Sequence, residues 1–229
     1  MNQAVELAAT LSESLVSDTY INGIVGFAWS DINTIKPKRQ NTWFDNIKST
    51  LPLPIFTADL KHNEPGSYDF GFINQTKFMG DTIAYQSVTT RYGYWMIGFN
   101  GYSIGNGKTL TPAQDPAIVD TGTSLLMMEQ DLVEAYYDQI TEAEYSDYQG
   151  GFVVPCAAVL PALTLQFGNY SAVIGSQYMT YGEVSPTFCF GALQVGPQGL
   201  NILGDIFFKA QFVVFDGGFP PRVGFAPKS

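Results

Sequence analysis

The chain has 229 residues, 45% of them hydrophobic, which is enough for one large all-β domain or two small ones with a substantial core. Its 21 acidic and 11 basic side chains give a formal net charge of −10, which repels nucleic-acid phosphates and anionic membrane surfaces. No apolar run has membrane-spanning length, and Met1 is followed by no apolar signal-peptide core. We therefore expect a globular acidic chain with no nucleic-acid partner, no membrane partner and no signal peptide.

The first 40 residues contain one helical and one strand-like pattern. Apolar residues in 4–15 recur at helical spacing. The run Gly-Ile-Val-Gly-Phe-Ala at 23–28 predicts a short buried strand. The only basic run, from Lys36 to Arg39, contains a proline and is typical of a solvated loop.

The next 30 residues predict one short helix and two strands. Asn41 is the expected N-cap of a helix that places Trp43 and two further apolar residues on one face. Strands are expected at 55–60 and 67–73, around a turn that contains His62, the only histidine. No serine has the flanking glycines of a nucleophile elbow, so we interpret His62 as a polar loop residue.

Beyond residue 80 the pattern is one of short strands with one longer helix. Residues 82–88 and 94–102 alternate well enough to predict paired strands, followed by a hairpin turn at glycines 101, 105 and 107. Apolar residues after Asp131 recur at helical spacing and predict an amphipathic helix. Further short strands are expected at 152–154, 163–167, 172–174 and near Cys189, with one helical turn at 205–209.

One acid in the second half stands in a distinctive context, the string Ile-Val-Asp-Thr-Gly-Thr-Ser-Leu-Leu at 118–126. Asp120 lies at the tip between two apolar strands, where Gly122 permits a sharp turn and Thr121, Thr123 and Ser124 offer hydroxyl donors. Such donors favour the ionised carboxylate and fix its orientation, which a water-activating base requires. The three letters Asp-Thr-Gly alone would also fit an ordinary turn.

The whole string resembles the active-site loop of fungal pepsin-like aspartic proteases of the penicillopepsin and endothiapepsin type. The sequence Asn-Ile-Leu-Gly-Asp at 201–205, and the segments 211–216 and 223–226, resemble the same family. The resemblance implies an all-β acid-protease fold in which 202–204 threads beside the catalytic loop. It also implies that 1–80 is a remnant of the N-terminal lobe and the interlobe sheet, and that 81–229 is the complete C-terminal lobe. On this basis 4–15 should begin as a strand rather than a helix, and 23–28 should be the first-lobe counterpart of 202–204.

The resemblance also implies roles for individual residues. Asp120 is the expected catalytic acid, Thr121, Gly122 and Thr123 support it, and Asp205 adjusts its environment. The family uses neither a metal nor another cofactor.

Cys156 and Cys189 match the positions of a family disulfide, which would contribute about 3 to 4 kcal/mol by closing its loop. Such a bond favours an oxidising compartment and hence a secreted protein or one of the secretory pathway. Two buried thiols are the alternative that two cysteines leave open.

The chain departs from the family because it contains one Asp-Thr-Gly loop, whereas a complete member carries two, the first in an N-terminal segment. Two facing carboxylates normally divide the roles of base and acid. Three interpretations follow: an aspartic endopeptidase completed by a light chain or by residues outside this sequence, a non-proteolytic enzyme that uses Asp120 alone on a small molecule, and a catalytically silent binding protein. A light chain, or self-association through 1–80, is expected to cover exposed strand edges.

Overall fold

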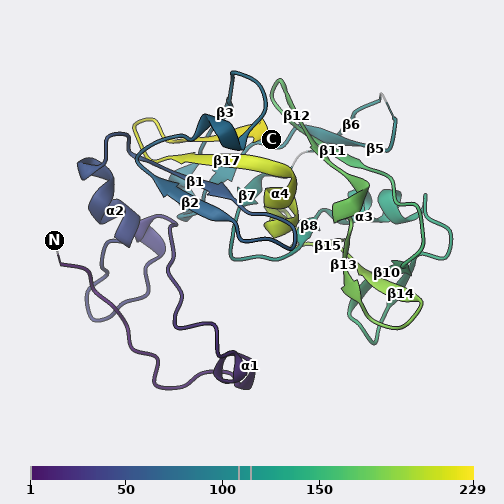
Figure 1. Ribbon diagram of the computed structural model, residues 1–229, viewed down its shortest axis with the longest axis horizontal. Coiled ribbons are helices and arrows are strands. Elements are labelled where there is room, and N and C mark those ends of the chain that lie inside the picture. Colours follow the sequence, from purple (N-terminus) through teal and green to yellow (C-terminus); the bar gives the residue numbers. More distant parts are fainter. Residues whose placement is uncertain (1, 108, 114) are drawn as a thin grey trace.

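The computed structural model describes residues 2–107, 109–113 and 115–229. Over these residues the protein is all-β, as predicted, with four sheets and a few short helices (Figure 1). None of the helices in these three ranges is long and apolar enough to cross a membrane. The α-helices are α1 (Glu13–Ser17), α2 (Trp43–Ile47), α3 (Gln130–Tyr137) and α4 (Asp205–Ala210).

Two of the sheets have five strands. The first has the order β2-β1-β17-β18-β3, with β1 (Ile55–Asp59), β2 (Ser67–Phe70), β3 (Ala84–Ser87), β17 (Gln211–Asp216) and β18 (Arg222–Pro227). The second has the order β15-β8-β16-β7-β4, with β4 (Met96–Ile97), β7 (Ala117–Val119), β8 (Leu126–Met128), β15 (Leu193–Val195) and β16 (Asn201–Leu203).

The other two sheets have four strands each. One has the order β12-β11-β5-β6, with β5 (Gly101–Ile104), β6 (Thr111–Pro112), β11 (Leu163–Phe167) and β12 (Tyr170–Ile174). The other has the order β13-β14-β10-β9, with β9 (Glu144–Ser146), β10 (Gly151–Pro155), β13 (Thr180–Glu183) and β14 (Phe188–Gly191).

The first five-stranded sheet joins parts of the chain that are far apart in sequence. Strand β1 pairs antiparallel with β17, and Phe56 lies opposite Phe215 with the two rings stacked at 4.4 Å. Trp95 packs edge-on against Phe215 at 5.2 Å, so this aromatic group links the sheet to the segment that leads into β4. The sheet contains strands from both 1–80 and 81–229, and the division at residue 80 stays a prediction.

The helices predicted for the second half are confirmed. The first turn of α3 contains Asp131, and the apolar face of this helix, including Tyr136 and Tyr137, is buried. The buried Tyr137 hydroxyl donates a 2.7 Å hydrogen bond to the Leu193 carbonyl oxygen, which satisfies its polar group in the core. Helix α4 begins at Asp205, as the sequence predicted for a single helical turn.

Both patterns predicted for the first 30 residues are wrong (Figure 1). Segment 4–15 is neither a strand nor a continuous helix, because only α1 forms at its end, and segment 23–28 forms no strand. Ile24 is 86% exposed and Val25 is 60% exposed, so the strand predicted as buried lies on the surface. A strand needs a neighbouring strand to pair with, and the described residues between 2 and 54 form no strand pair.

Two further predictions need correction. The N-cap of α2 is Thr42 rather than Asn41, because the Thr42 hydroxyl accepts a hydrogen bond from the Asp45 backbone N–H. Segments 82–88 and 94–102 form no strand pair with each other, and the one isolated bridge nearby joins Met96 to Thr89, just beyond residue 88. Instead β3 pairs with β18, β4 with β7, and β5 with β11, since tertiary neighbours rather than local alternation select strand partners.

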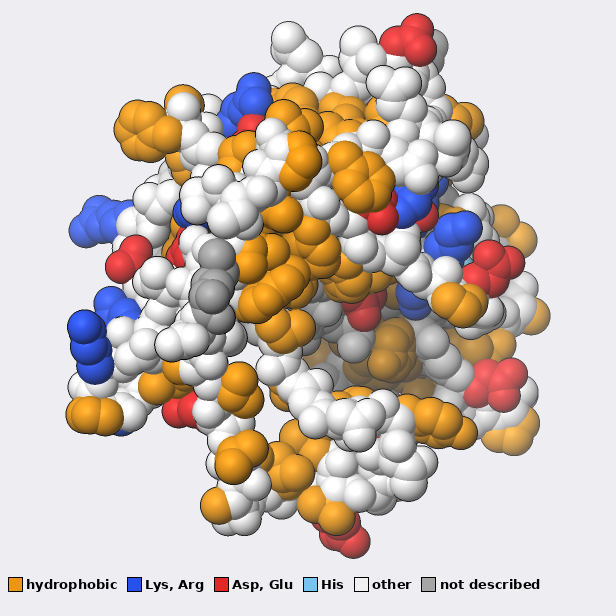
Figure 2. Space-filling model, turned by 60° about the vertical axis from the view of Figure 1, so that its left-hand side comes forward, with side chains coloured by type: hydrophobic (Ala, Val, Ile, Leu, Met, Phe, Trp, Pro, Cys, Tyr) orange, Lys and Arg blue, Asp and Glu red, His pale blue; other side chains and the backbone are white. Residues whose placement is uncertain are grey.

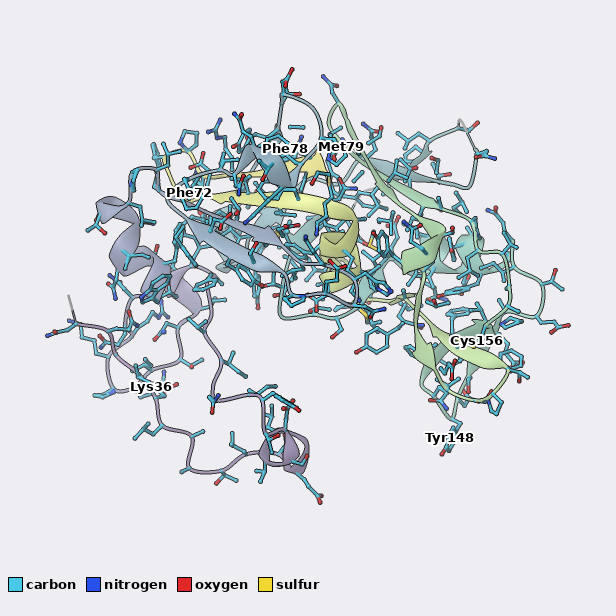
Figure 3. All side chains as sticks on the ribbon, in the orientation of Figure 1. Lys36, Phe72, Phe78, Met79, Tyr148 and Cys156 are labelled. Carbon is cyan, nitrogen blue, oxygen red and sulfur yellow. A yellow bond between two sulfur atoms is a disulfide. The ribbon has the colours of Figure 1, made fainter. Side chains whose placement is uncertain are left out.

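The predicted disulfide between Cys156 and Cys189 is present, and Figure 3 labels Cys156. The disulfide connects the end of β10 to β14, next to the position where Val154 and Cys189 lie opposite each other in the sheet. The loop that it closes contains the β11–β12 hairpin. The predicted hairpin after residue 101 is also confirmed, since β5 pairs with β6 and Gly105 has a φ of 62°.

Candidate active site

The Asp120 loop is placed by three neighbouring strands. Strand β7 leads into the loop, β8 leaves it, and β16 lies between them, parallel to β7 and antiparallel to β8. The Asp120 backbone N–H donates a 3.1 Å hydrogen bond to the Leu203 carbonyl oxygen at the end of β16. The predicted strand beside the loop is therefore present, and it fixes the backbone of the acid.

Both carboxylate oxygens of Asp120 accept a hydrogen bond from the loop itself. The Gly122 backbone N–H donates to Oδ1 at 2.9 Å, and the Thr123 hydroxyl donates to Oδ2 at 2.8 Å. A Cβ at Gly122 would lie 3.1 Å from Oδ1, so the glycine keeps the space beside the carboxylate clear. No basic side chain forms an ion pair with Asp120 within residues 2–107, 109–113 and 115–229.

Gly204 lets the start of α4 pack directly against this loop. A Cβ at Gly204 would lie 2.3 Å from the carbonyl oxygens of both Thr123 and Leu125. The Asp205 backbone N–H donates to the Thr123 carbonyl oxygen at 2.7 Å, and the next residue of α4, Ile206, donates to Ser124. Strand β16 and helix α4 thus support the loop from behind.

Asp120 faces a cavity of about 580 Å³ with predominantly apolar walls. Thr121, Gly122 and Tyr68 also line it, together with the rings of Phe56, Phe70, Trp95 and Phe215 and the exposed residues Ile24 and Val25. Figure 2 shows a hollow on this side of the molecule, bordered by hydrophobic side chains. The carboxylate therefore meets a space that fits an apolar ligand with a few polar groups.

Tyr68 is the residue of this cavity that sequence reasoning missed. Burial raises the pKa of its phenol, a hydrogen bond with the Thr121 side chain lowers it, and the charges of Asp205 and Asp120 raise it. The phenol therefore stays protonated and can donate a hydrogen bond close to Asp120. Nothing in the sequence distinguished this residue, because it lies on β2 and only the sheet arrangement brings it to the loop.

Asp205 lies behind the Asp120 loop rather than in the cavity wall. Its Oδ1 is buried and has no hydrogen-bond partner among the described residues. Burial raises the pKa of Asp205, the charge of Lys209 lowers it, and the charge of Asp120 raises it. Asp205 and Asp120 are therefore close enough to influence each other, although only Asp120 faces the cavity.

Three acids in the first 70 residues form ion pairs away from the Asp120 loop. Asp45, Asp59 and Asp69 form ion pairs with Lys48, Lys228 and Lys77 respectively. His62 lies in an exposed turn, where its ring packs against Tyr178 with centroids 5.8 Å apart. The cavity thus contains a single catalytic candidate, Asp120.

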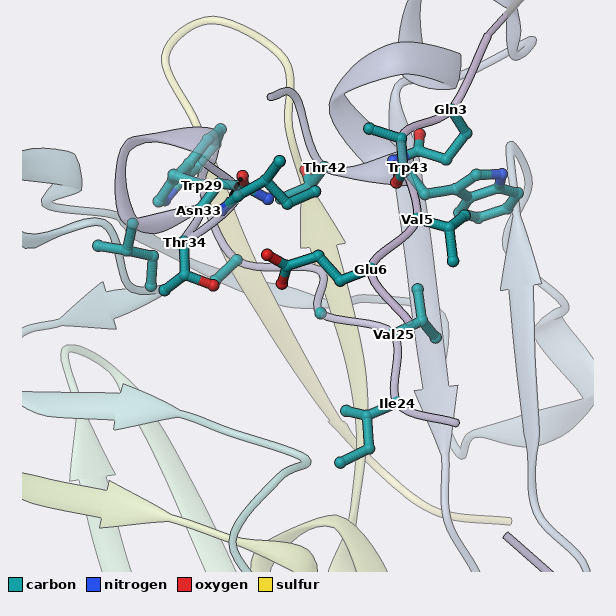
Figure 4. A pocket seen from close by; sticks show the side chains of 15 residues that line it. Gln3, Val5, Glu6, Ile24, Val25, Trp29, Asn33, Thr34, Thr42 and Trp43 are labelled. Atoms are coloured by element: carbon teal, nitrogen blue, oxygen red, sulfur yellow. Dashed lines mark hydrogen bonds between the residues drawn. The ribbon is translucent and has the colours of Figure 1, made fainter. Parts of the chain in front are cut away.

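A second cavity of about 560 Å³ adjoins the first through Ile24 and Val25, which line both. The N-terminal segment crosses it, and Figure 4 shows the Glu6 side chain extending into it. Trp29 and Trp43 form part of its wall. The N-terminal segment therefore borders open apolar spaces instead of filling them.

Comparison with known proteins agrees with the all-β pepsin-like fold. The family model for eukaryotic aspartyl proteases matches residues 1–228, and the chain therefore belongs to this family.

Its relatives include fungal pepsin-like enzymes. The chain is 43% identical to aspergillopepsin-1 of Aspergillus clavatus, over 99% of the chain and 58% of that protein. It is 43% identical to penicillopepsin-3 of Penicillium janthinellum, over 99% of the chain and 57% of that protein. It is 42% identical to penicillopepsin-1 of Talaromyces stipitatus, over the whole chain and 58% of that protein. The chain thus spans less than two thirds of the length of the curated relatives it matches.

Proposed function

We propose that Asp120 is a catalytic carboxylate of an aspartic-type endopeptidase. The observation that carries this proposal is the geometry of the carboxylate: each oxygen accepts one hydrogen bond from the loop, none of the described basic residues pairs with it, and it faces an apolar cavity. In this role Asp120 takes a proton from a water molecule, and the resulting hydroxide attacks the carbonyl carbon of a peptide. Gly122 and Thr123 hold the carboxylate in place by hydrogen bonds. Thr121 positions the Tyr68 phenol at the cavity wall through their side-chain hydrogen bond.

Peptide hydrolysis in this manner also needs an acid to protonate the leaving amine. Asp205 does not serve, because it does not line the cavity and its carboxylate lies behind the loop. We propose that a second acid is supplied from outside this sequence, by a complementing light chain or by further residues of a longer protein. Either would cover Ile24 and Val25 at the open side of the cavity.

A non-proteolytic enzyme on the same scaffold is the second candidate. The observation that favours it is that the cavity already brings one carboxylate and one phenol, Asp120 and Tyr68, together among aromatic rings. A small apolar molecule with a carbonyl or hydroxyl group would fit such a cavity without a second acid. A catalytically silent binding protein is the third candidate.

Peptide cleavage at acid pH distinguishes these candidates. The chain is assayed together with the light chain or further residues that supply the second acid, with and without a pepstatin-type inhibitor, beside Asp120→Asn and the control Asp147→Asn, which changes an exposed turn residue. Cleavage that is inhibited, lost in Asp120→Asn and retained in Asp147→Asn supports the endopeptidase. No cleavage with a retained small ligand selects the non-proteolytic enzyme, and neither activity nor ligand selects the binding protein. An Asp120→Asn variant with full activity would rule out the assigned residue.

We further propose a secretory location and a covering partner for residues 1–80. The disulfide supports the first proposal, because such bonds persist in oxidising compartments. The exposed Ile24 and Val25 support the second, with self-association as the alternative to a light chain. Light scattering over a wide concentration range tests self-association, and a strictly monomeric species would exclude it.

A further inference from the structure

Four of the eleven basic residues of the chain line a single cavity that is distinct from the Asp120 cavity. The cavity has a volume of about 540 Å³ and contains Lys61, Lys77, Lys209 and Lys228. We call it the lysine cavity. Its other lining residues include the hydroxyl-bearing Ser67, Thr76 and Tyr178, and none of its residues lines the Asp120 cavity.

Strand register explains why four separate segments meet here. Gln211 lies opposite Pro227 in the β17–β18 pair, which brings Lys228 close to the end of α4 and Lys209. An isolated bridge between Phe78 and Lys228 brings Lys77 to the same end. Asp59 lies opposite Ser67 at the end of the β1–β2 pair, and the turn that joins these strands begins at Lys61. The lysines are thus gathered by the main sheet, although they are distant in sequence.

Two of the lysines are oriented by carboxylates behind them. Lys228 donates to Asp59 Oδ1 at 2.9 Å and to the Leu60 carbonyl oxygen, and its side chain is only 14% exposed. Lys77 donates to Ser67 Oγ at 2.8 Å and to Asp69, and its side chain is 18% exposed. An ammonium group has three N–H donors, so each of these lysines retains one.

The other two lysines have no such partner. Lys61 and Lys209 form no hydrogen bond or ion pair with the residues that the structure describes. Burial lowers the pKa of Lys228, its hydrogen bond and ion pair with Asp59 raise it, and the positive charge of Lys61 lowers it. The proximity of Lys61 and Lys228 is therefore a like-charge contact that an anion between them would relieve.

The charge balance of the lining is positive in a chain that is strongly negative as a whole. Four lysines stand against two acidic side chains of the lining, Asp59 and Glu64, and against Asp69, which pairs with Lys77. Together these side chains keep one excess positive charge, against a net charge of −10 for the chain. Lys77 and Lys228 each have one N–H donor left, and the ammonium groups of Lys61 and Lys209 form no ion pair. Such a set of charged donors suits an oxyanion, which has many acceptor oxygens.

We propose that the lysine cavity binds a phosphate group, either as the free ion or as part of a small phosphate ester. Lys77 and Lys228 provide N–H donors whose positions are fixed by Asp69 and Asp59. Lys61 and Lys209 donate further hydrogen bonds to the anion. None of these lysines lines the Asp120 cavity, so the proposal does not rest on the proposed function, although the charge of Lys209 reaches Asp205.

Titration of the full chain with inorganic phosphate at constant ionic strength tests this proposal, with binding followed by calorimetry and by the thermal unfolding midpoint. Saturable binding is expected, with a rising midpoint, because a ligand that binds only the folded state stabilises it. Glycerol phosphate in a parallel titration shows whether an ester binds as well as the free ion. Chloride and acetate serve as control anions, and acetate binding equal to phosphate binding would overturn the proposal.

Two double variants make the test specific. Lys61→Gln with Lys209→Gln removes the two lysines that form no ion pair and leaves the ion pairs of Lys77 and Lys228 intact, so the variant should fold, and its unfolding midpoint without phosphate serves as its own reference because Lys209 also acts on Asp205. Its phosphate affinity should fall about tenfold or more, because two charge-assisted donors are lost. The control, Lys36→Gln with Lys38→Gln, changes exposed residues of a distant loop, where Figure 3 labels Lys36. Absence of saturable binding, or an equal loss of affinity in the control, would refute the site.

Discussion

Replacement of Gly204 by alanine tests whether the packing of α4 against the Asp120 loop holds the candidate site together. The added methyl group would lie 2.3 Å from two backbone carbonyl oxygens, those of Thr123 and Leu125. Backbone atoms cannot rotate away as a flexible side chain can, so the loop and the helix start must separate. This separation should move Asp120, because its backbone N–H donates a hydrogen bond to Leu203, the residue before Gly204.

The expected cost follows from the hydrogen bonds at this junction. Three backbone bonds connect the loop to β16 and α4: Asp120 to Leu203 at 3.1 Å, Asp205 to Thr123 at 2.7 Å, and Ile206 to Ser124 at 3.3 Å. At about 1 kcal/mol each, their loss lowers the free energy of unfolding by about 3 kcal/mol. Overpacking of a well-filled site costs a similar amount, about 1 to 3 kcal/mol.

Urea unfolding of Gly204→Ala and of a matched control, Gly182→Ala, measures this cost. A Cβ at Gly182 has no atom within 4 Å and the residue is exposed in β13, so the control should be unchanged or more stable by up to about 1 kcal/mol. A difference between the two variants below about 1 kcal/mol would refute the packing argument, since it would fall within ordinary surface effects. Any Asp120-dependent activity should fall in Gly204→Ala and persist in Gly182→Ala.

Three further predictions concern the disulfide and the two acids. Replacing Cys156 and Cys189 by alanine should lower the free energy of unfolding by about 3.7 kcal/mol on the chain-entropy estimate for a separation of 33 residues, and a loss below about 1 kcal/mol in urea unfolding would contradict this. Asp205 has a raised pKa, so the folded state gains stability from its protonation at low pH and loses it as the pH rises through the folded-state value. In urea unfolding, the free energy of unfolding of Asp205→Asn should therefore depend less on pH than that of the unchanged protein. Above the folded-state pKa of Asp205 the variant should be the more stable of the two. A steeper pH dependence in the variant would contradict this prediction. Thr123→Val should lower stability by about 1 kcal/mol or more by removing the hydroxyl that donates to Asp120, whereas Thr123→Ser should retain most of it, as urea unfolding can show.

The sequence determined the elements whose information is local. Apolar spacing after Asp131 was sufficient for α3, because a helix forms its hydrogen bonds within one segment. The donors to Asp120 come from Gly122 and Thr123, two and three residues along the chain, so the geometry of the loop was encoded in the string at 118–126.

Tertiary structure decided the properties that depend on a distant partner. The same kind of apolar run is a buried strand at β7, where β4 and β16 flank it, and an irregular, largely exposed segment at 23–28, where no neighbouring strand pairs with it. Tyr68 reaches the Asp120 cavity, and four lysines meet in another, only through sheet order and register. A strand leaves half of its hydrogen bonds and one face for other segments to complete, so strand partners and the cavities between sheets are set by the whole fold and not by local sequence.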